Sequence, residues 1–511
     1  MSSNLRRRMR STLLGVAAAL ALVTVLAAAV MTSDWAAQRV RRELVETLQA
    51  RFDATVSIGQ VSLSLFPRVS IEGRDLALTR TPDRHTLPSI RASRFHVSGS
   101  PLHLLRRSVD LVVLDGLEIR VAKGATPKKA RRRTPPDLVI SEIQVSSGLL
   151  LILPDDPEKL PLRFDLEQVV FRDFSFERAG RYQARLTNPK PAGFIDSTGS
   201  FGPWNTFDPR STPLSGDYAF TDANLATIPG LGGTLSSTGR FGGVLGRIDV
   251  SGTTSTPDFQ LAIAGQPLNL DTRFRAVVDG TSGDTFLNDV DVTLGQSHIV
   301  ASGSVAGDRG APGRTVLLEV RADGPFEDFL RLSVKAARPP MRGVITLTTS
   351  FELPPGEIDV VRRMRLAGTF GIKNGRFTAG SVQQKVDELS RRGQGEPESD
   401  RVNALSSFGG TFALQDGHLR LQRFRFAVEG ARVELRGGYR LPSQELDFSG
   451  LLILDAPVSQ TTTGFKSLLL KLVDPLLRKN GAGTVLPVTV SGTVASPSFR
   501  VDLKKALLPG R

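Results

Sequence analysis

The sequence contains no cysteine among its 511 residues, and it has only two tryptophans and three tyrosines beside 27 phenylalanines. The absence of cysteine excludes disulfide bonds, thiolate metal sites and cysteine nucleophiles, although it does not identify a cellular compartment. Apolar residues make up 40% of the chain. That share is enough to build a sizeable core, which excludes a wholly disordered protein.

Motifs for catalysis, nucleotide binding and metal binding are also missing. The sequence has no H-E-x-x-H, G-x-S-x-G, Walker A or G-x-G-x-x-G motif, and no RRM or zinc-finger signature points to nucleic acid. The five histidines are scattered along the chain: His85, His96, His103, His298 and His418. We therefore predict a protein that is not an enzyme, needs no cofactor or metal and binds no nucleic acid.

One acidic cluster is a candidate cation site. Asp284, Asp289 and Asp291 lie in the segment SGDTFLNDVDV. The alternation of this segment predicts a strand, on which Asp289 and Asp291 share a face but lack the loop that calcium sites require. We interpret the cluster as part of a solvated sheet face.

A single long apolar run lies near the N-terminus. The first 12 residues form a basic segment, with four arginines in MSSNLRRRMR. An uncharged run over residues 13–31 follows. About 19 residues rising ~1.5 Å each span roughly 28 Å, close to a bilayer core. The sequence thus predicts a membrane anchor with its N-terminus in the cytoplasm. Its candidate residues are Leu13, Leu14, Leu20, Leu22 and Leu26, with Trp35 at the interface.

The alternative for this run is a cleaved signal peptide, since residues 27–29 are all alanine. Either interpretation exports the rest of the chain, so we expect a single-pass protein of the inner membrane with its bulk in the periplasm.

A second basic segment, residues 122–137, carries six basic side chains among prolines. It is interpreted as a solvated flexible loop, with contact to anionic lipid headgroups as the alternative.

Periodicity changes from helix to strand after residue 51. Val40, Leu44 and Leu48 are spaced for one face of a helix over residues 36–51. Period-two alternation follows through Val61, Leu63 and beyond, with a short helical turn expected at 101–107. From residue 138 onward the chain alternates almost throughout, with a turn every 8–12 residues, which is the spacing of a meander.

Two internal repeats punctuate this pattern. VSGTTSTPDFQLAI begins at Val250 and VSGTVASPSFRVDL at Val490; in both we expect V-S-G-T to end one strand and the proline to turn the chain into the next. LAGTFGIKNGRF and FGGTFALQDGHL form the second repeat. Their dipeptides Asn374-Gly375 and Asp416-Gly417 both predict tight hairpin turns.

Two helices are expected within the C-terminal part. The first, near 381–392, begins with a capping box of Ser381 and Gln384 and lines up Val382, Val386 and Leu389 as a cover on a sheet. The second, near 464–479, is rich in leucine. It is interpreted as a helix capping an open sheet, or as a segment that lies on a membrane surface.

The order of these motifs resembles the AsmA family, with its AsmA-like, TamB-like and YhdP-like envelope proteins. The resemblance is carried by the N-terminal span, VSIGQVSLSLFPRVSIEGRDLAL (56–78), the strands of 89–121, GTFALQDGHL, the leucine-rich helix and VLPVTVSGTVASPSFRVDL (485–503). It implies an inner-membrane anchor, a periplasmic β-sheet curled into an apolar groove, and a role in outer-membrane assembly and phospholipid movement. This chain is shorter than the largest relatives, which puts full bridging of the periplasm in doubt.

The expected fold is mainly β: an N-terminal transmembrane helix, then a long, curved, mostly antiparallel sheet forming an open groove with a few short covering helices. The expected segments are 36–121, an AsmA-like N-terminal unit, then 138–365, a central groove segment, and 366–511, an AsmA-like C-terminal domain. Some 25–30 strands about 4.8 Å apart extend on the order of 100 Å. A packed β-sandwich fits the same alternation.

The expected function is to carry or bridge phospholipid along the groove. The candidate groove residues are Phe259, Leu261, Ile263, Leu419, Leu421, Phe424, Phe426, Phe499 and Val501. The alternatives are an envelope scaffold or chaperone for outer-membrane proteins that pairs along a free sheet edge, or regulates protein targeting to the membrane, and a cryptic hydrolase. The expected partners are the inner membrane, phospholipids and, for the scaffold, outer-membrane or envelope proteins.

Overall fold

A computed structural model describes the chain over most of its length. The described residues are 34–52, 55–64, 68–79, 89–105, 108–122, 139–153, 162–175, 177–204, 208–307, 313–398, 400, 402–456 and 484–501. The anchor candidates at 13–31, most of the basic loop and the leucine-rich helix lie outside these residues. Trp35 falls in the first described helix. Among the described helices, none has the length and apolar character needed to cross a bilayer.

The described chain is mainly β, as the alternation predicts. Its helices are α2 (Asp34–Phe52), α3 (Pro101–Leu105), α4 (Phe326–Ser333), α5 (Val360–Arg363) and α6 (Gly380–Gln394), with 3-10 turns η1 (Pro209–Ser211) and η2 (Leu225–Thr227). The strands in its first half are β1 (Thr55–Ser57), β2 (Val61–Ser64), β3 (Val69–Thr79), β4 (Ser89–Gly99), β5 (Ser108–Ala122), β6 (Val139–Leu153), β7 (Leu162–Phe174), β8 (Gly180–Pro189), β9 (Ala192–Phe201), β10 (Pro213–Asn224), β11 (Leu231–Gly232), β12 (Thr234–Val244) and β13 (Arg247–Leu261).

The remaining strands continue the same meander. They are β14 (Leu268–Val278), β15 (Thr285–Leu294), β16 (Ser297–Gly307), β17 (Arg314–Pro325), β18 (Met341–Leu353), β19 (Arg365–Phe377), β20 (Ser406–Gln415), β21 (His418–Val428), β22 (Ala431–Arg440), β23 (Glu445–Leu454), β24 (Thr484–Thr493) and β25 (Pro497–Val501). All 25 belong to one sheet. The sandwich alternative, which needs two packed sheets, is therefore not what the described residues form.

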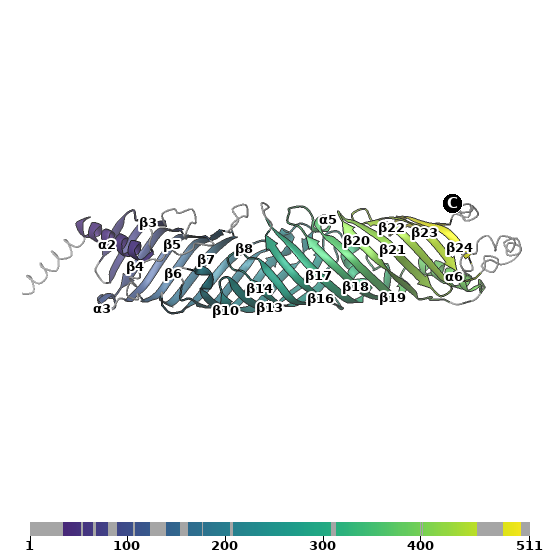
Figure 1. Ribbon diagram of the computed structural model, residues 1–511, viewed down its shortest axis with the longest axis horizontal. Coiled ribbons are helices and arrows are strands. Elements are labelled where there is room, and N and C mark those ends of the chain that lie inside the picture. The colour runs from purple at the N-terminus through teal and green to yellow at the C-terminus, as the bar shows by residue number, and fades with distance from the viewer. Residues whose placement is uncertain are drawn as a thin grey trace, which may run out of the picture.

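The sheet is one curled, open half-barrel whose strands cross it obliquely, with α2 near one end and α6 near the other (Figure 1). Successive strands pair antiparallel along almost its whole length. One described pair, β5 with β6, is parallel; the connection between them contains most of the basic, proline-rich segment. The predicted curved, mostly antiparallel sheet is thus confirmed.

Several local predictions are confirmed. The helix expected at 36–51 is α2, and Leu44 and Leu48 pack against a buried cluster that contains Val56 and Phe95. The turn at 101–107 is α3. The helix expected near 381–392 is α6, and its Val386 is buried against the sheet.

The capping box was wrong. The residue preceding α6 is Ala379, which has no side-chain cap, so Ser381 and Gln384 lie inside the helix. The helix is instead held by buried polar side chains in its middle: Gln383 Oε1 accepts from Phe377 N at 2.9 Å, and Asp387 Oδ1 accepts from Ala404 N at 2.8 Å. The tertiary contacts of α6 have replaced the local cap.

The predicted hairpin at Asn374-Gly375 was also wrong, because β19 runs straight through these residues. Asn374 has a φ of 56°, and the register shifts between Ile372 and Gly375, so the dipeptide forms a bulge. Asp416-Gly417 is a true two-residue turn, with Gln415 opposite His418 and both turn residues at positive φ. Asn374, Asp416 and Gly417 have the positive φ that a tight turn needs, whereas Gly375 does not, which fits a bulge at the first site and a turn at the second.

Candidate functional site: the inner wall

One face of the curled sheet forms an almost uncharged wall. Because side chains alternate along each strand, the cross-strand registers assign the paired residues of β8–β24 to one of two faces. The face that carries Phe274, Val320 and Phe412 has apolar, glycine, serine, threonine and tyrosine residues, with Asn188 at the end of β8 and one charged side chain, Arg314, at the rim end of β17 opposite Gly307. We call this face the inner wall.

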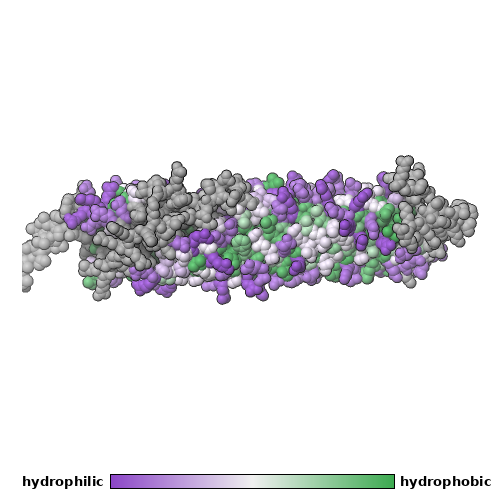
Figure 2. Space-filling model, in the orientation of Figure 1, coloured by the Kyte–Doolittle hydropathy of each residue, from purple (hydrophilic) through white to green (hydrophobic). Residues whose placement is uncertain are grey.

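The opposite face carries the charges, paired across strands. Arg275 Nη2 lies 2.7 Å from Asp289 Oδ2, and Arg365 Nη1 lies 2.9 Å from Glu352 Oε1. Figure 2 shows the result as a band of neutral and apolar residues along the molecule, flanked by hydrophilic ones. Such a division is the pattern of a sheet with one dry and one wet face.

Bulges keep the wall continuous. The register of β21 shifts between Leu421 and Phe424 against both neighbouring strands. The extra residue restores the face, so Leu419, Leu421, Phe424 and Phe426 all point to the inner wall. The sequence indicated an irregularity here, and the structure shows that it is a bulge.

Inward-facing glycines allow close approach between strands. A Cβ on Gly450 would lie 1.8 Å from the carbonyl oxygen of Glu434, and one on Gly199 would lie 2.0 Å from that of Ser215. Aromatic rings cover several of these positions: the Tyr218 ring lies against Gly239, and Phe241 and Tyr182 lie against Gly216. Glycine paired with a covering aromatic ring is a common way to bend a sheet without exposing its backbone.

Helices cover the wall at both ends. At the N-terminal end α2 packs on Val56, Ile58, Leu78 and Phe95. At the C-terminal end α6 packs over Phe426, Leu452 and Leu486, and α4 packs over Ile345 and Ile372. Phenylalanines form a chain of ring contacts beneath them, with Phe408 5.0 Å from Phe426 between centroids.

The middle section of the wall, which we define as β9–β12 and β14–β17, has no such cover. The five hydrophobic clusters of the described residues include no residue from these strands. Side chains such as Thr272, Val292 and Val320 are half-buried. This section is the part of the wall that remains accessible within the described chain.

The middle section is lined by hydroxyl groups as well as apolar groups. Its hydroxyl side chains include Ser197, Tyr218, Ser237 and Thr272. Those of Tyr182 on β8 and Thr254 on β13 lie beside them on the same face. The Tyr182 hydroxyl lies 2.9 Å from Ser197 Oγ, and that of Tyr218 lies 3.2 Å from Ser237 Oγ. Burial raises the pKa of both tyrosines. The hydroxyls are thus neutral and mutually bonded, and they add no charge to the wall.

The two rims of the trough meet at one place, which we call the seam. Antiparallel strands turn alternately at opposite rims, so the connections at 190–191, 225–233 and 262–267 lie on one rim and the connection 354–364 lies on the other. Lys190 Nζ nevertheless lies 2.7 Å from Glu357 Oε2, and Val360 N donates to Pro229 O at 2.9 Å. The mouth of the trough, meaning the gap between its rims, is bridged here.

A small apolar cluster lies inside the seam. Val361 of α5 is buried with Leu414 and Leu441, and Leu261 and Ile263 from the opposite rim pack against them. Leu419 and Tyr439 join the same cluster, where the Tyr439 hydroxyl is buried without a hydrogen-bond partner in the described residues. Three groove candidates from the sequence, Leu261, Ile263 and Leu419, are therefore brought together at the seam.

The other groove candidates lie elsewhere. Leu421 and Phe426 are buried, and Phe424 and Phe426 belong to the wall beneath α6. Phe259 follows a bulge at the end of β13. Phe499 is 55% exposed on β25, with Lys385 Nζ of α6 5.9 Å from its ring centroid, and Val501 is the last residue of that strand.

The sequence predicted a central groove segment at 138–365 but provided no groove candidate on the strands of the middle section. Its residues were passed over because they are small or hydroxylated, although they alternate regularly, as in Ser197-x-Gly199-x-Phe201 and Ser237-x-Gly239-x-Phe241. A glycine or serine two residues before an aromatic residue, repeated on neighbouring strands, was the available signal.

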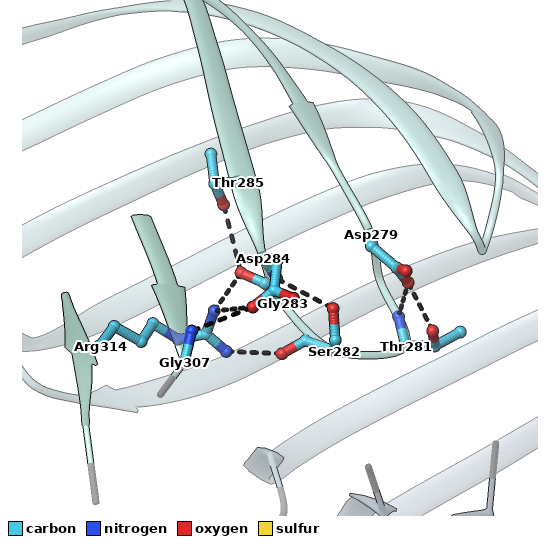
Figure 3. Close-up of polar contacts among 8 residues, drawn as sticks. All are labelled: Asp279, Thr281, Ser282, Gly283, Asp284, Thr285, Gly307 and Arg314. Carbon is cyan, nitrogen blue, oxygen red and sulfur yellow. Dashed lines mark hydrogen bonds and ion pairs between the residues drawn. The ribbon is translucent and has the colours of Figure 1, made fainter. Parts of the chain in front are cut away.

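A polar clasp braces one rim beside the middle section (Figure 3). Arg314 at the start of β17 donates to the carbonyl oxygens of Ser282 (2.7 Å) and Gly283 in the β14–β15 turn and lies 3.6 Å from Asp284. Burial lowers the pKa of Arg314. These bonds satisfy turn carbonyls, which indicates a structural role.

The acidic cluster does not form a cation site in the described residues. Asp284 belongs to the clasp, Asp289 pairs with Arg275, and Asp291 Oδ1 lies 2.7 Å from His298 Nε2. No group of three or more His, Asp or Glu side chains in the described chain is placed to hold a metal. The interpretation of this cluster as a solvated sheet face is consistent with these pairings.

A hollow of about 580 Å³ lies on the outer face, and Gly438, which has no side chain, is among the residues that line it. Its lining includes Arg420, Arg436 and Asp447, and Arg440 is paired with Glu445 at 2.9 Å. Because all these side chains are exposed on the charged outer face, the hollow does not bring charged groups to the inner wall.

Comparison with known proteins gives no relative. No family model, curated protein or solved structure matches the chain. The resemblance to the AsmA family therefore stays a prediction. The functional argument depends on the wall itself.

Proposed function

We propose that the protein holds the acyl chains of phospholipid against the inner wall and carries or bridges lipid along it. As the sequence predicts, it would do so as an inner-membrane-anchored protein of the periplasm that contributes to outer-membrane biogenesis. The observation that carries the proposal is the wall: a surface of apolar and hydroxyl side chains that runs over β8–β24, carries a charge only at Arg314 on its rim, and has no helix packed on the apolar side chains of its middle section.

The energetics favour such a cargo. Each buried methylene group gains about 0.8 kcal/mol, so two acyl chains of about 16 carbons avoid more than about 20 kcal/mol of exposure to water. A wall of many similar contacts offers no single deep site. Lipid bound there can therefore exchange one set of contacts for the next along the sheet.

The polar headgroup fits the same geometry. A charged phosphate buried against an almost uncharged wall is penalised by several kcal/mol. The headgroup therefore stays at the mouth of the trough while the acyl chains lie inside. Exposed charged side chains on the rims, such as Lys190 and Glu357, provide a polar setting for it.

Site-specific photocrosslinking tests the proposal with neighbouring residues as a matched pair. Thr272 of β14 faces the inner wall, and Arg273 follows it on the outer face. Benzoylphenylalanine is placed at either position of the full chain in bacterial membranes. We expect phospholipid adducts from position 272 and none from position 273, detected by mass spectrometry.

The outcome at position 272 also separates the alternatives. Adducts with outer-membrane proteins, together with such adducts from Ser498 on β25, would favour the scaffold or chaperone. The absence of any lipid adduct at 272, in protein whose circular dichroism matches that of the wild type, would contradict the lipid proposal.

A further inference from the structure

The connection between β18 and β19, residues 354–364, is built as one rigid unit. We call it the strap. Arg363 braces it internally, since Nε donates to Ile358 O at 2.8 Å and Nη1 donates to Pro354 O. Asp359 caps α5 by accepting from Val361 N at 2.7 Å. These bonds lie within the strap and do not depend on the opposite rim.

The polar contacts of the strap across the mouth are fewer than its internal hydrogen bonds. The Lys190–Glu357 ion pair is exposed, with 39% and 84% of the two side chains accessible. Exposed pairs contribute about 0–1 kcal/mol. Beyond this pair, the described contacts across the mouth are the Val360–Pro229 hydrogen bond, close packing of Asp359 on Gly230, and the apolar contacts of Leu261 and Ile263.

The seam obstructs the path that the proposed function requires. If acyl chains lie on the wall and the headgroup stays at the mouth, a lipid moving along the trough meets a bridge across that mouth. Passage beneath the bridge would take a charged phosphate past Val361, Leu414 and Leu441, which offer it no polar partner. Separating the contacts across the mouth therefore costs less than burying the phosphate beneath the bridge.

We propose that the seam is a gate: the strap must separate from the rim at Lys190 and Pro229 for a phospholipid to pass between the N-terminal and C-terminal parts of the wall. This inference rests on the proposed function and adds a control point to it. A rigid strap with few polar contacts across the mouth can open without losing its own structure, because its internal bonds travel with it.

A reversible lock tests the gate, and the natural absence of cysteine leaves no background thiols. Lys190→Cys and Glu357→Cys are introduced together into the full chain and joined with a short, cleavable bis-maleimide. The control joins Arg275→Cys to Asp289→Cys, which face each other on the outer face of β14 and β15. Both pairs leave the inner wall unchanged.

Vesicles of phosphatidylethanolamine and phosphatidylglycerol, containing a phospholipid with a photoactivatable acyl chain, supply the cargo. After illumination, labelled peptides are mapped by mass spectrometry on β6–β7 and on β23–β24, which lie on the two sides of the seam (Figure 1) and contribute no residue to its apolar cluster. We expect labelling on both sides in the wild type and the control. In the locked protein it falls at least about tenfold on one side or both, and cleaving the crosslinker restores it.

Equal labelling on both sides of the locked protein, within about twofold of the wild type, would overturn the gate while leaving the lipid proposal intact. Absence of labelling on both walls of the wild type would instead contradict the proposed function. Glu357→Lys provides a second arm, since it replaces the ion pair by repulsion. Labelling beyond the seam should then be about two- to fivefold faster, and the Lys190→Glu/Glu357→Lys exchange should reverse the gain.

Discussion

The middle and C-terminal sections of the inner wall are built on one pattern but differ in what covers them. Both alternate inward glycine with aromatic or aliphatic residues, as at Gly199 and Gly450. In the C-terminal section α6 lies on the wall and buries Leu452 and Phe426. In the middle section larger wall residues such as Val292 and Val320 are half-buried, smaller ones such as Ala276 and Ala301 are buried, and none belongs to a hydrophobic cluster with a helix.

This difference separates two uses of one sheet surface. Where a helix covers it, the apolar face is a protein core, and its burial stabilises the fold. Where no helix covers it, the same face leaves apolar area exposed, which a folded protein rarely does over a long surface without a ligand or partner. Under the proposed function, the covered ends contribute stability and the middle contributes binding, and each contribution can be tested separately.

The largest effect is expected from a charge placed on each section. Leu452→Asp puts a carboxylate beneath α6, where no partner is available, and should lower the free energy of unfolding by about 4 kcal/mol. Val292→Asp places the same group in the half-buried middle section and should cost about 1 kcal/mol while abolishing lipid adducts. Urea unfolding of the two variants gives the difference. Equal losses would show that the middle section is as closed as the end.

The inward glycines should behave alike in both sections, because the sheet bends in both. Gly450→Ala and Gly199→Ala each drive a methyl group into a neighbouring carbonyl and should each cost about 3 kcal/mol. Gly409, whose added Cβ would meet nothing closer than 3.4 Å, is the control. Gly409→Ala should change stability by less than about 0.5 kcal/mol. A neutral Gly199→Ala would mean that the middle section is flexible enough to absorb the strain.

Loosening α6 should make the C-terminal section resemble the middle. Asp387 Oδ1 accepts hydrogen bonds from Ala404 N and Gln383 Nε2, both at 2.8 Å. Asp387→Ala removes both bonds and should cost about 2 kcal/mol, with faster hydrogen exchange confined to α6. Asp387→Asn keeps an acceptor oxygen and should lose less than half as much. If exchange instead rises uniformly over the sheet, α6 is an integral part of the fold and not a cover.

How much the sequence could predict is shown by its repeated phrase. V-S-G-T…P-x-F forms a strand, a turn and a strand at residues 490–499, where Ser496 N donates to Thr493 O. At 250–259 the same letters form one strand, β13, with a bulge between Thr256 and Phe259. The prediction for the first copy was wrong because β13 continues beyond the proline: Phe259 pairs with Leu268 of β14, and Leu261 pairs with Leu231 of β11.

Period-two patterning predicted the strands and which residues share a face, because alternation is a local property of each strand. The curled sheet was what the resemblance to the AsmA family implied, since a packed sandwich fits the same alternation. The seam is different. Its contacts join Lys190 to Glu357, 167 residues apart, and depend on how far the sheet tilts and curls over many strands. The pattern therefore gave Leu261 and Leu419 as wall residues but gave no sign that they would meet.

A smaller effect should distinguish the tyrosine hydroxyls of the middle section from the one at the seam. Tyr218→Phe removes the hydrogen bond to Ser237 and should cost about 1 kcal/mol. Tyr439→Phe removes a buried hydroxyl without a partner among the described residues and should be neutral or slightly stabilising. Urea unfolding at neutral pH compares them. A loss at Tyr439 equal to that at Tyr218 would reveal a partner for its hydroxyl, bridging water included.

The smallest effect is expected at alkaline pH. Burial raises the pKa of all three tyrosines in the chain, Tyr182, Tyr218 and Tyr439. Near pH 10 the unfolded chain begins to lose these protons while the folded chain keeps them, so the unfolded state binds fewer protons and stability falls as pH rises. The loss should be at most about 0.4 kcal/mol per tyrosine at pH 10. Absorbance titration at constant temperature should show less tyrosinate in the folded protein than in the unfolded chain at that pH. Tyrosinate that appears with the ordinary midpoint, and that comes from Tyr182 or Tyr218 when these are replaced singly by Phe, would show that water reaches the middle wall freely enough to cancel its burial.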